Sequence, residues 1–460
     1  MKTKIVLLFS LLLGFNSVFA QQDEECMSNL SIFSEYVKAK NYDAAYEPWM
    51  KVRNKCPKFN KAIYVYGEKI LKDKIEKSTG TDKIAYIEDL FKLWDQRMEY
   101  YPNDTKVGET LAEKAQFMYD EKDLLGKSQE DLYNAFDTAY KTDKKTFTNP
   151  KSLYTYFKLM VGLYDDGSKT AQQLFDKYDD LAEKIEDEVK NYTKRLNKLV
   201  LKEADSTKSL SKKDEKYKRY FESFLKAYDQ VSTGMDTELG TRANCSNLIP
   251  LYQKGFEENK NNTVWLQRAM NRLYNKECTD DPMFEKIVEQ KNILEPNAST
   301  AYYLGVLKDK KGETAAALKF YNQAIDLETD SFEKANMLFK VASKMKAKGS
   351  YSSARNYYRK ALKENPSMGK CYIAIAQMYA KSAASCGDDN FSQRAIYWLA
   401  ANESRKAGRV DAKLKSTAEK QAANYEAKAP TKSEIFQKGN AGQTITFKCW
   451  VGGSVKVPSI

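Results

Sequence analysis

The chain has 460 residues, 75 Lys and Arg against 63 Asp and Glu, a formal net charge of +12 and no histidine. The lack of histidine excludes Ser-His-Asp and Cys-His nucleophile systems, His-ligated zinc sites and histidine proton shuttles. Apolar residues at helical spacing, with only ten prolines, favour a nearly all-α protein.

The first twenty residues are typical of an export signal. Lys2 and Lys4 give a basic start, Ile5 to Leu13 form a short apolar run, and Val18-Phe19-Ala20 supplies a small-residue cleavage site. Nothing later in the sequence is long and apolar enough to span a bilayer. We therefore predict a signal peptide at residues 1–20 and an exported protein that is periplasmic or secreted.

Residues 21–168 are predicted to form N-terminal helical hairpins. Cys26 to Pro57 has the pattern of a first, degenerate unit, in which Phe33 marks one helix and Trp49 the next. Further helices are expected at Asn60–Leu71, Asp82–Tyr101, Thr105–Tyr119, Ser128–Tyr140 and Pro150–Tyr164.

The pattern changes over residues 169–244. From Thr170 to about Ala204, apolar residues recur every three or four positions without Gly or Pro, which predicts one helix of roughly 50 Å at 1.5 Å per residue. After a polar turn, Tyr217 to Met235 supply a matching stripe. We predict an antiparallel coiled-coil hairpin that interrupts the repeats, and its tip is one candidate partner contact.

Residues 245–428 contain the clearest internal repetition, in the stretches Ala298–Asp330 and Ala335–Ser367. Small and aromatic residues recur at matching offsets: Leu304, Gly305, Gly312, Ala317, Tyr321 and Ala324 in the first, and Val341, Ala342, Gly349, Ala354, Tyr358, Ala361 and Pro366 in the second. Each stretch has the pattern of two amphipathic helices joined at a glycine, which resembles the tetratricopeptide repeat (TPR). The resemblance implies stacked helical hairpins with a concave surface.

Additional units flank these two repeats, and a short tail follows. Helices are expected at Ser246–Asn259, Thr263–Lys276, Gly369–Lys406 (with a swollen loop at Ser382–Asn390) and Asp411–Lys428. In the tail, residues 429–460, Thr444–Trp450 and Ser454–Val457 alternate in polarity around two glycines and predict a small β-hairpin. The predicted fold class is all-α: a TPR-like superhelix of helical hairpins, interrupted by the coiled-coil hairpin, with a C-terminal β-hairpin.

Seven cysteines in an exported chain predict disulfides with one cysteine left over. Two pairs flank helical hairpins, whose open ends they would join, and a third would tether the tail to the swollen loop. The predicted bridges are Cys26–Cys56, Cys245–Cys278 and Cys386–Cys449. Cys371 is expected to remain free and to pack as a small apolar side chain.

No sequence motif indicates catalysis, a cofactor or a metal, and we expect none of the three. Acidic pairs such as Asp179-Asp180 fit caps and solvated helix faces. By repeat position, the concave surface is predicted to contain Tyr302, Val306, Phe339, Ser343, Lys346, Ile373, Gln377 and Lys381. Such a groove would bind a peptide or helix of a partner. The alternative is that these residues pack on a neighbouring helix or on the long hairpin.

The wider pattern, including Ser385-Cys386-Gly387 and the segment Phe447 to Gly453, resembles exported TPR proteins of Bacteroidota. This resemblance implies a cell-envelope location. The sequence thus predicts a non-enzymatic scaffold for protein partners in the bacterial envelope, serving outer-membrane protein assembly, secretion or surface machinery, with no nucleic-acid partner. The alternative is a module that binds cell wall or anionic glycolipid through the basic face from Lys340 to Lys456, in peripheral contact with the outer membrane or cell wall.

Overall fold

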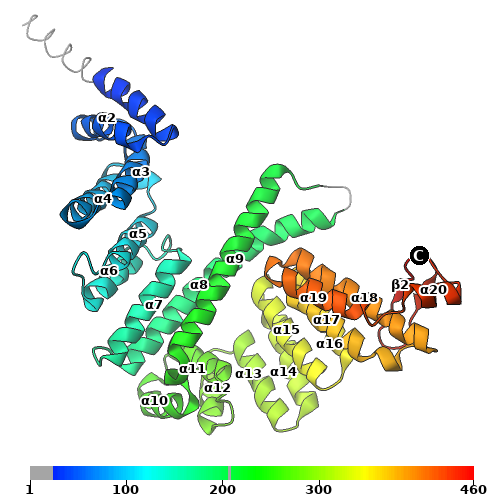
Figure 1. The fold of residues 1–460 in the computed structure, drawn as a ribbon. Helices are drawn as coiled ribbons and strands as arrows, with labels where there is room; N and C mark the ends of the chain where they lie inside the picture. Colours follow the sequence, from blue (N-terminus) through cyan, green and yellow to red (C-terminus); the bar gives the residue numbers. More distant parts are fainter. Residues whose placement is uncertain (1–23, 206–208, 460) are drawn as a thin grey trace, which may run out of the picture. The chain divides into compact units, whose positions relative to one another are not determined.

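The computed structural model describes residues 24–205 and 209–459 (Figure 1). The predicted signal peptide, residues 1–20, lies outside these described residues. The chain divides into two compact units, Met1–Lys177 and Tyr178–Ile460, and the division falls inside the long helix α8 (Ala171–Ala204). The domain boundaries inferred from the sequence remain predictions.

The first unit consists of consecutive helical hairpins, as the sequence predicts. Residues 24–38 form a helix, and Asn41 begins the next one by accepting a hydrogen bond from the backbone N–H of Ala44. The following helices are α2 (Tyr42–Lys55), α3 (Ala62–Lys77), α4 (Gly80–Tyr100), α5 (Val107–Asp120), α6 (Gln129–Thr142) and α7 (Pro150–Asp165), with a 3-10 turn, η1 (Pro102–Asp104), after α4. The helix α3 continues well beyond Leu71, where the sequence pattern ends it.

A tryptophan holds the first hairpins together. Trp49 of α2 is fully buried, and its indole N–H donates to the carbonyl of Ile63 at 2.7 Å. A Cβ placed on Gly67 of α3 would lie 2.6 Å from the Trp49 ring, so the close approach of α3 to this ring requires glycine. The indole therefore gains its apolar burial without leaving its N–H unsatisfied.

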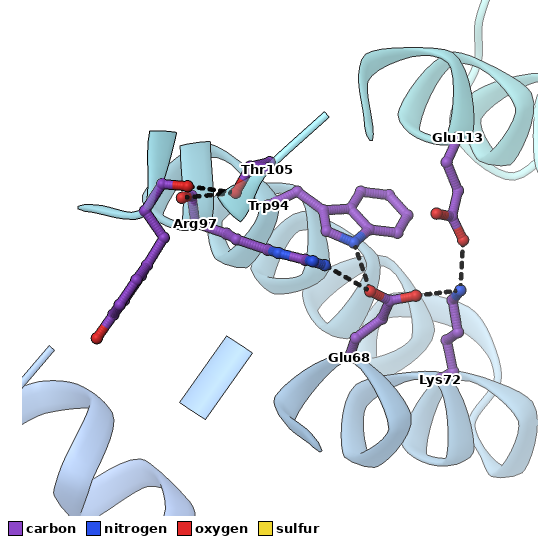
Figure 2. A network of polar contacts seen from close by, with 7 residues as sticks. Glu68, Lys72, Trp94, Arg97, Thr105 and Glu113 are labelled. Atoms are coloured by element: carbon purple, nitrogen blue, oxygen red, sulfur yellow. Dashed lines mark hydrogen bonds and ion pairs between the residues drawn. The ribbon is translucent and has the colours of Figure 1, made fainter. Parts of the chain in front are cut away.

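A polar network joins α3, α4 and α5 beside this core (Figure 2). Glu68 accepts a hydrogen bond from the indole N–H of Trp94 at 3.2 Å and pairs with Lys72 at 2.7 Å. Lys72 also reaches Glu113 of α5 at 2.6 Å, and Arg97 lies 3.8 Å from Glu68. Each charged group in the network has a partner of opposite charge, so we assign it a structural role in fixing how successive helices pack.

The second unit begins with the long hairpin. After α8 ends at Ala204, α9 (Lys212–Leu239) returns beside it (Figure 1). The hydroxyl of Tyr178 donates to Asp236 at 2.8 Å, whereas Lys202 pairs with Asp214 at 2.7 Å. Residues early in α8 therefore contact residues late in α9 and the reverse, which confirms the predicted antiparallel hairpin.

The C-terminal array follows as stacked helices (Figure 1). Its helices are α10 (Cys245–Asn259), α11 (Thr263–Asn275), α12 (Pro282–Leu294), α13 (Ala298–Lys310), α14 (Thr314–Leu327), α15 (Ser331–Ala347), α16 (Tyr351–Glu364), α17 (Gly369–Lys381), α18 (Asn390–Val410) and α19 (Lys415–Glu426), with 3-10 turns η2 (Gly240–Ala243), η3 (Ala383–Ser385) and η4 (Ala412–Leu414). The two clear repeats form the pairs α13–α14 and α15–α16. The helix α12 is not predicted from the sequence, because its segment lacks the small residues that mark the repeats.

The tail forms the predicted β-hairpin, in which β1 (Thr444–Thr446) pairs antiparallel with β2 (Ser454–Lys456). The short helix α20 (Lys432–Lys438) is not predicted from the sequence; it begins at a capping box formed by Thr431 and Glu434. The turn of the β-hairpin packs on the array, because the Trp450 ring lies 5.5 Å from Tyr351 and 5.6 Å from Tyr379.

The structure contains the three predicted disulfides, and Cys371 is free and buried. Cys26–Cys56 and Cys245–Cys278 each join the start of one helix to the end of its neighbour. Cys386–Cys449 links the loop after α17 to the β-hairpin, 63 residues away in sequence. Closing loops of this length restricts the unfolded chain by roughly 3–4 kcal/mol per bridge.

Candidate functional site

Small residues set the spacing of the repeat helices that form the candidate site. A Cβ on Gly305 of α13 would lie 2.6 Å from the ring of Tyr321 on α14, so the two helices pack this closely only with glycine. Gly312 and Gly349 occupy the turns after α13 and α15 with φ of 77° and 76°. Few residues other than glycine adopt this left-handed conformation, which lets each chain turn directly into its second helix.

The long hairpin lies across the array through a series of contacts along α8. Asp179 pairs with Arg272 of α11, Lys190 lies 3.0 Å from Glu333 of α15, and the side-chain oxygen of Asn197 accepts from the backbone N–H of Ser367 at 3.2 Å. These contacts are made successively along the length of α8. The helix therefore crosses several repeats and covers part of their surface.

Two predicted groove residues, Tyr302 and Val306, are not in an open groove. Each has a fractional exposure of only 3%. The Tyr302 ring packs 5.4 Å from Tyr321, and its hydroxyl is hydrogen-bonded to that of Tyr274 at 2.8 Å. For Tyr302 and Val306 the structure thus gives the packing role that the sequence analysis left open as the alternative.

The other six predicted residues line one groove with a volume of about 730 Å³ on α15, α16 and α17. The structure brings together Phe339, Ser343, Lys346, Ile373, Gln377 and Lys381. It adds lining residues that the sequence analysis did not assign to the groove: Ala347, Tyr351, Tyr358, Lys370, Ala374 and Met378. Of these, Lys370 belongs to the basic run noted in the sequence, and Tyr358 to the repeat pattern.

Three lysines give the groove a positive charge, which the Asp411 carboxylate offsets in part near Lys370. Lys346, Lys370 and Lys381 have no ion-pair partner among residues 24–205 and 209–459. Lys346 donates to the side-chain oxygen of Gln377, and the Lys370 ammonium lies 4.2 Å from the centre of the Phe339 ring. Burial lowers the pKa of Lys346, and the nearby charge of Lys381 lowers it further. Burial also lowers the pKa of Lys370.

Aromatic rings and a hydroxyl pair form the apolar part of the groove. The rings of Phe339 and Tyr358 lie 5.4 Å apart, and the hydroxyls of Ser343 and Tyr358 are hydrogen-bonded at 3.0 Å. Tyr351 contributes a further ring, which packs against Trp450 of the β-hairpin. A groove with aromatic rings between ammonium groups offers apolar contact area and charge at the same time.

A second cavity, of about 490 Å³, separates part of the hairpin from the array. Its walls include Val189 and Leu196 of α8, Leu225 of α9, and Met368 beside α17. Glu186 stands at its exposed rim. Reduced hydration and the neighbouring carboxylate of Glu333 raise the pKa of Glu186 to about 7.

The described part of the chain holds no group of three or more His, Cys, Asp or Glu side chains arranged to hold a metal ion. In the same part, no helix combines the length and the apolar character needed to cross a membrane.

The fold and the groove define a class: the chain has a TPR-like helical-repeat fold with an open groove on α15–α17. No family model matches it. It is 34% identical over 107 residues to the photosystem I assembly protein Ycf3 of Cyanophora paradoxa, and 30% identical over 110 residues to that of Synechococcus elongatus. These matches cover 21% and 22% of this chain and 62% and 64% of the relatives, so the chain spans slightly less than two thirds of their length.

Solved helical-repeat structures are similar to much of the chain, but at low identity. Human IFIT1 in complex with PPP-AAAA is 15% identical, with 78% of this chain and 76% of that chain covered and a TM-score of 0.31. Yeast Tom70 is 11% identical, with 91% and 84% covered and a TM-score of 0.26. Scores this low carry no argument about function.

Proposed function

We propose that this chain is an exported scaffold of the bacterial envelope, which recruits a protein partner through the groove on α15–α17. The observation that carries this proposal is the positive charge of Lys346, Lys370 and Lys381, which form no direct ion pair with the described residues, around an aromatic groove. A partner segment with Asp or Glu side chains next to an apolar residue would neutralise the lysines and cover the rings. No catalytic or cofactor chemistry is part of the proposal.

Two other observations support the parts of the proposal that concern location and role. The N-terminal sequence has the pattern of an export signal, and six of seven cysteines are bridged, as is usual in oxidising compartments. The matched relatives are assembly proteins by name, which agrees with a role in bringing proteins together.

The test uses the chain without residues 1–20 as bait for proteins of the bacterial envelope, with chemical crosslinking to map contacts. The triple variant Lys346→Gln, Lys370→Gln, Lys381→Gln should bind the captured partner at least about tenfold more weakly, because three charge-assisted contacts are lost. Three exposed lysines outside the groove, Lys363, Lys420 and Lys432, changed to Gln provide the matched control. Crosslinks that map to other helices, with no effect of the triple variant, would reject the groove as the binding site.

The same material tests the alternative of cell-wall or anionic-glycolipid binding. Binding through lysines alone should disappear at high ionic strength, whereas a partner held by the aromatic groove should be retained. Binding to isolated cell wall that disappears with salt would favour the alternative.

A further inference from the structure

The part of the long hairpin farthest from its base is strongly basic. Residues 194–219 contain ten Lys and Arg against four Asp and Glu. Three of the four acids are already paired inside the hairpin: Glu203 with Lys218 at 2.6 Å, Asp214 with Lys202 at 2.7 Å, and Glu215 with Arg219 at 3.9 Å. The stretch therefore has more positive than negative charge even after these pairs are counted.

Four lysines in particular have no ion-pair partner among the described residues. They are Lys194 and Lys198 on α8, and Lys213 and Lys216 on α9. All four are exposed. An external anionic surface could neutralise them without breaking an existing ion pair.

Exposed apolar side chains lie among these lysines. Leu201 is 57% exposed, and Tyr217 and Tyr220 are each 47% exposed. The two tyrosine rings pack on the aromatic residues between α8 and α9, which we call the aromatic seam. The ring of Tyr220 lies 6.2 Å from that of Tyr192, and the ring of Tyr217 lies 6.1 Å from that of Phe221. The seam holds the tyrosines in place while part of each ring remains in water.

Helical periodicity places most of these residues on the side of the hairpin away from the array. On α8, Val189 and Leu196 line the cavity against the array, and positions 194 and 198 fall on the opposite side of the helix. On α9, Leu225 lines the cavity, positions 216 and 220 fall opposite, and positions 213 and 217 lie on the flank. We call this surface the outer hairpin face; it consists of Lys194, Lys198, Lys213, Lys216 and Tyr220, with Tyr217 at its edge.

We propose that the outer hairpin face docks on an anionic lipid bilayer. Lysines near a membrane surface are attracted to acidic headgroups, and their aliphatic stems can lie on apolar surface while the ammonium stays in water. Tyrosine places its ring at the boundary between headgroups and acyl chains and keeps its hydroxyl wet. The outer side of two adjacent helices is convex, so it can meet a flat bilayer along its length, whereas peptides and single nucleic-acid strands are bound in grooves.

The proposal is tested by vesicle flotation with the chain lacking residues 1–20. The probes are vesicles of phosphatidylcholine with about 30% phosphatidylglycerol, and vesicles of phosphatidylcholine alone, in about 100 mM NaCl, where surface charges still act over roughly 10 Å. The wild type should bind the anionic vesicles and not the neutral ones, and the binding should weaken as salt increases. The quadruple variant Lys194→Gln, Lys198→Gln, Lys213→Gln, Lys216→Gln should bind at least about tenfold more weakly.

Two matched variants distinguish binding through the outer hairpin face from an effect of the protein's net charge. Lys363→Gln, Lys420→Gln, Lys432→Gln and Lys456→Gln together remove the same charge from the C-terminal part and should keep vesicle binding within about twofold of the wild type. Changing the four hairpin lysines to Arg should also preserve binding, which shows that charge rather than lysine itself is needed. Circular dichroism verifies that each variant is folded.

Several outcomes would overturn the proposal. Equal binding to neutral vesicles would show that charge is not involved, and an equal loss in the C-terminal variant would assign the effect to net charge alone. Retention on immobilised heparin without any vesicle binding would assign the face to a soluble polyanion. The result is independent of the groove, because the hairpin variant should still bind the protein partner captured through Lys346, Lys370 and Lys381.

Discussion

Arg272 of α11 and Asp179 of α8 form an ion pair in which the side chains are only 4% and 11% exposed. Burial raises the pKa of Asp179 to about 6, against the opposing charge of Arg272. The guanidinium of Arg272 also donates to the hydroxyl of Tyr252. The prediction that Asp179-Asp180 belongs to a solvated face is therefore wrong for Asp179, which attaches the long hairpin to the beginning of the C-terminal array.

Replacing Arg272 should destabilise the protein strongly. Arg272→Met leaves the Asp179 carboxylate buried without its counter-ion, and we expect the free energy of unfolding to fall by about 3–5 kcal/mol. Arg268→Met is the matched control, because Arg268 pairs with Glu183 between the same two helices but with 24% and 49% of the side chains exposed. The control should cost less than about 1 kcal/mol. Urea denaturation measures both; equal losses would contradict the role given to the buried pair.

Gly305 should not accept a methyl group. In an open helix, Gly→Ala usually stabilises by about 1 kcal/mol, but here the new Cβ would lie 2.6 Å from Tyr321. We expect Gly305→Ala to destabilise by about 1–3 kcal/mol through overpacking. Gly255→Ala on α10 is a graded comparison, since its nearest contact would be 3.3 Å from Trp265, and its loss should be smaller. Thermal unfolding measures the loss of stability in each variant. A Gly305→Ala variant more stable than the wild type would contradict the close contact between Gly305 and Tyr321.

Removing the third disulfide should release the tail locally. In the double variant Cys386→Ala, Cys449→Ala, residues 444–457 lose their covalent link, and we expect faster hydrogen exchange there and around Tyr351, where Trp450 packs. The loop-closure contribution that is lost is about 4 kcal/mol for a bridge of this span. The double variant Cys26→Ala, Cys56→Ala should leave exchange in the tail unchanged. If the tail exchanges equally slowly in both variants, the packing of Trp450 alone is sufficient to hold the tail on the array.

Glu186 should make stability depend on pH near neutrality. Its pKa in the folded protein, about 7, is above the ordinary value of 4.5, so the folded state binds a proton more tightly than the unfolded chain. Its contribution to stability is therefore lowest above pH 7 and increases as the pH falls from about 8 to about 5. Glu186→Gln should be more stable than the wild type at pH 8 by about 1 kcal/mol, after allowance for solvent screening at an exposed rim, and equal to it near pH 5.

Thermal unfolding of Glu186→Gln and wild type over this pH range tests the expectation. Glu258→Gln, at an exposed position of α10, is the control and should follow the wild-type curve. Parallel curves for all three proteins would mean that Glu186 does not titrate in this range.

Local sequence patterns predict most of the helices because the residues that define them are close in sequence. The glycines at 312 and 349 and the small residues at 317 and 354 specify turns and helix crossings within one hairpin. The disulfides are predictable for the same reason, since each of the first two pairs flanks a single hairpin.

The contacts that the sequence does not predict join segments far apart in the chain. Arg272 and Asp179 are 93 positions apart, and nothing near Asp179 marks it as buried. In the same way, Tyr302 is packed because its ring meets Tyr274 of α11 and Tyr321 of α14, whereas Phe339 remains in the groove. Lys370 joins the groove because it lies three residues before Ile373, on the same face of α17. The repeat pattern alone does not mark it as a groove residue.

Solenoids of helical hairpins usually behave like springs, because each hairpin contacts only its neighbours. In this protein α8 is fastened to α11 through Asp179, to α15 through Lys190 and to the start of α17 through Asn197. Stretching or bending this part of the array therefore requires several contacts far apart in the chain to break together. This part of the array should resist changes in its curvature. The shape of the groove on α15–α17 is consequently set before any ligand arrives, and little ordering entropy remains to be lost on binding.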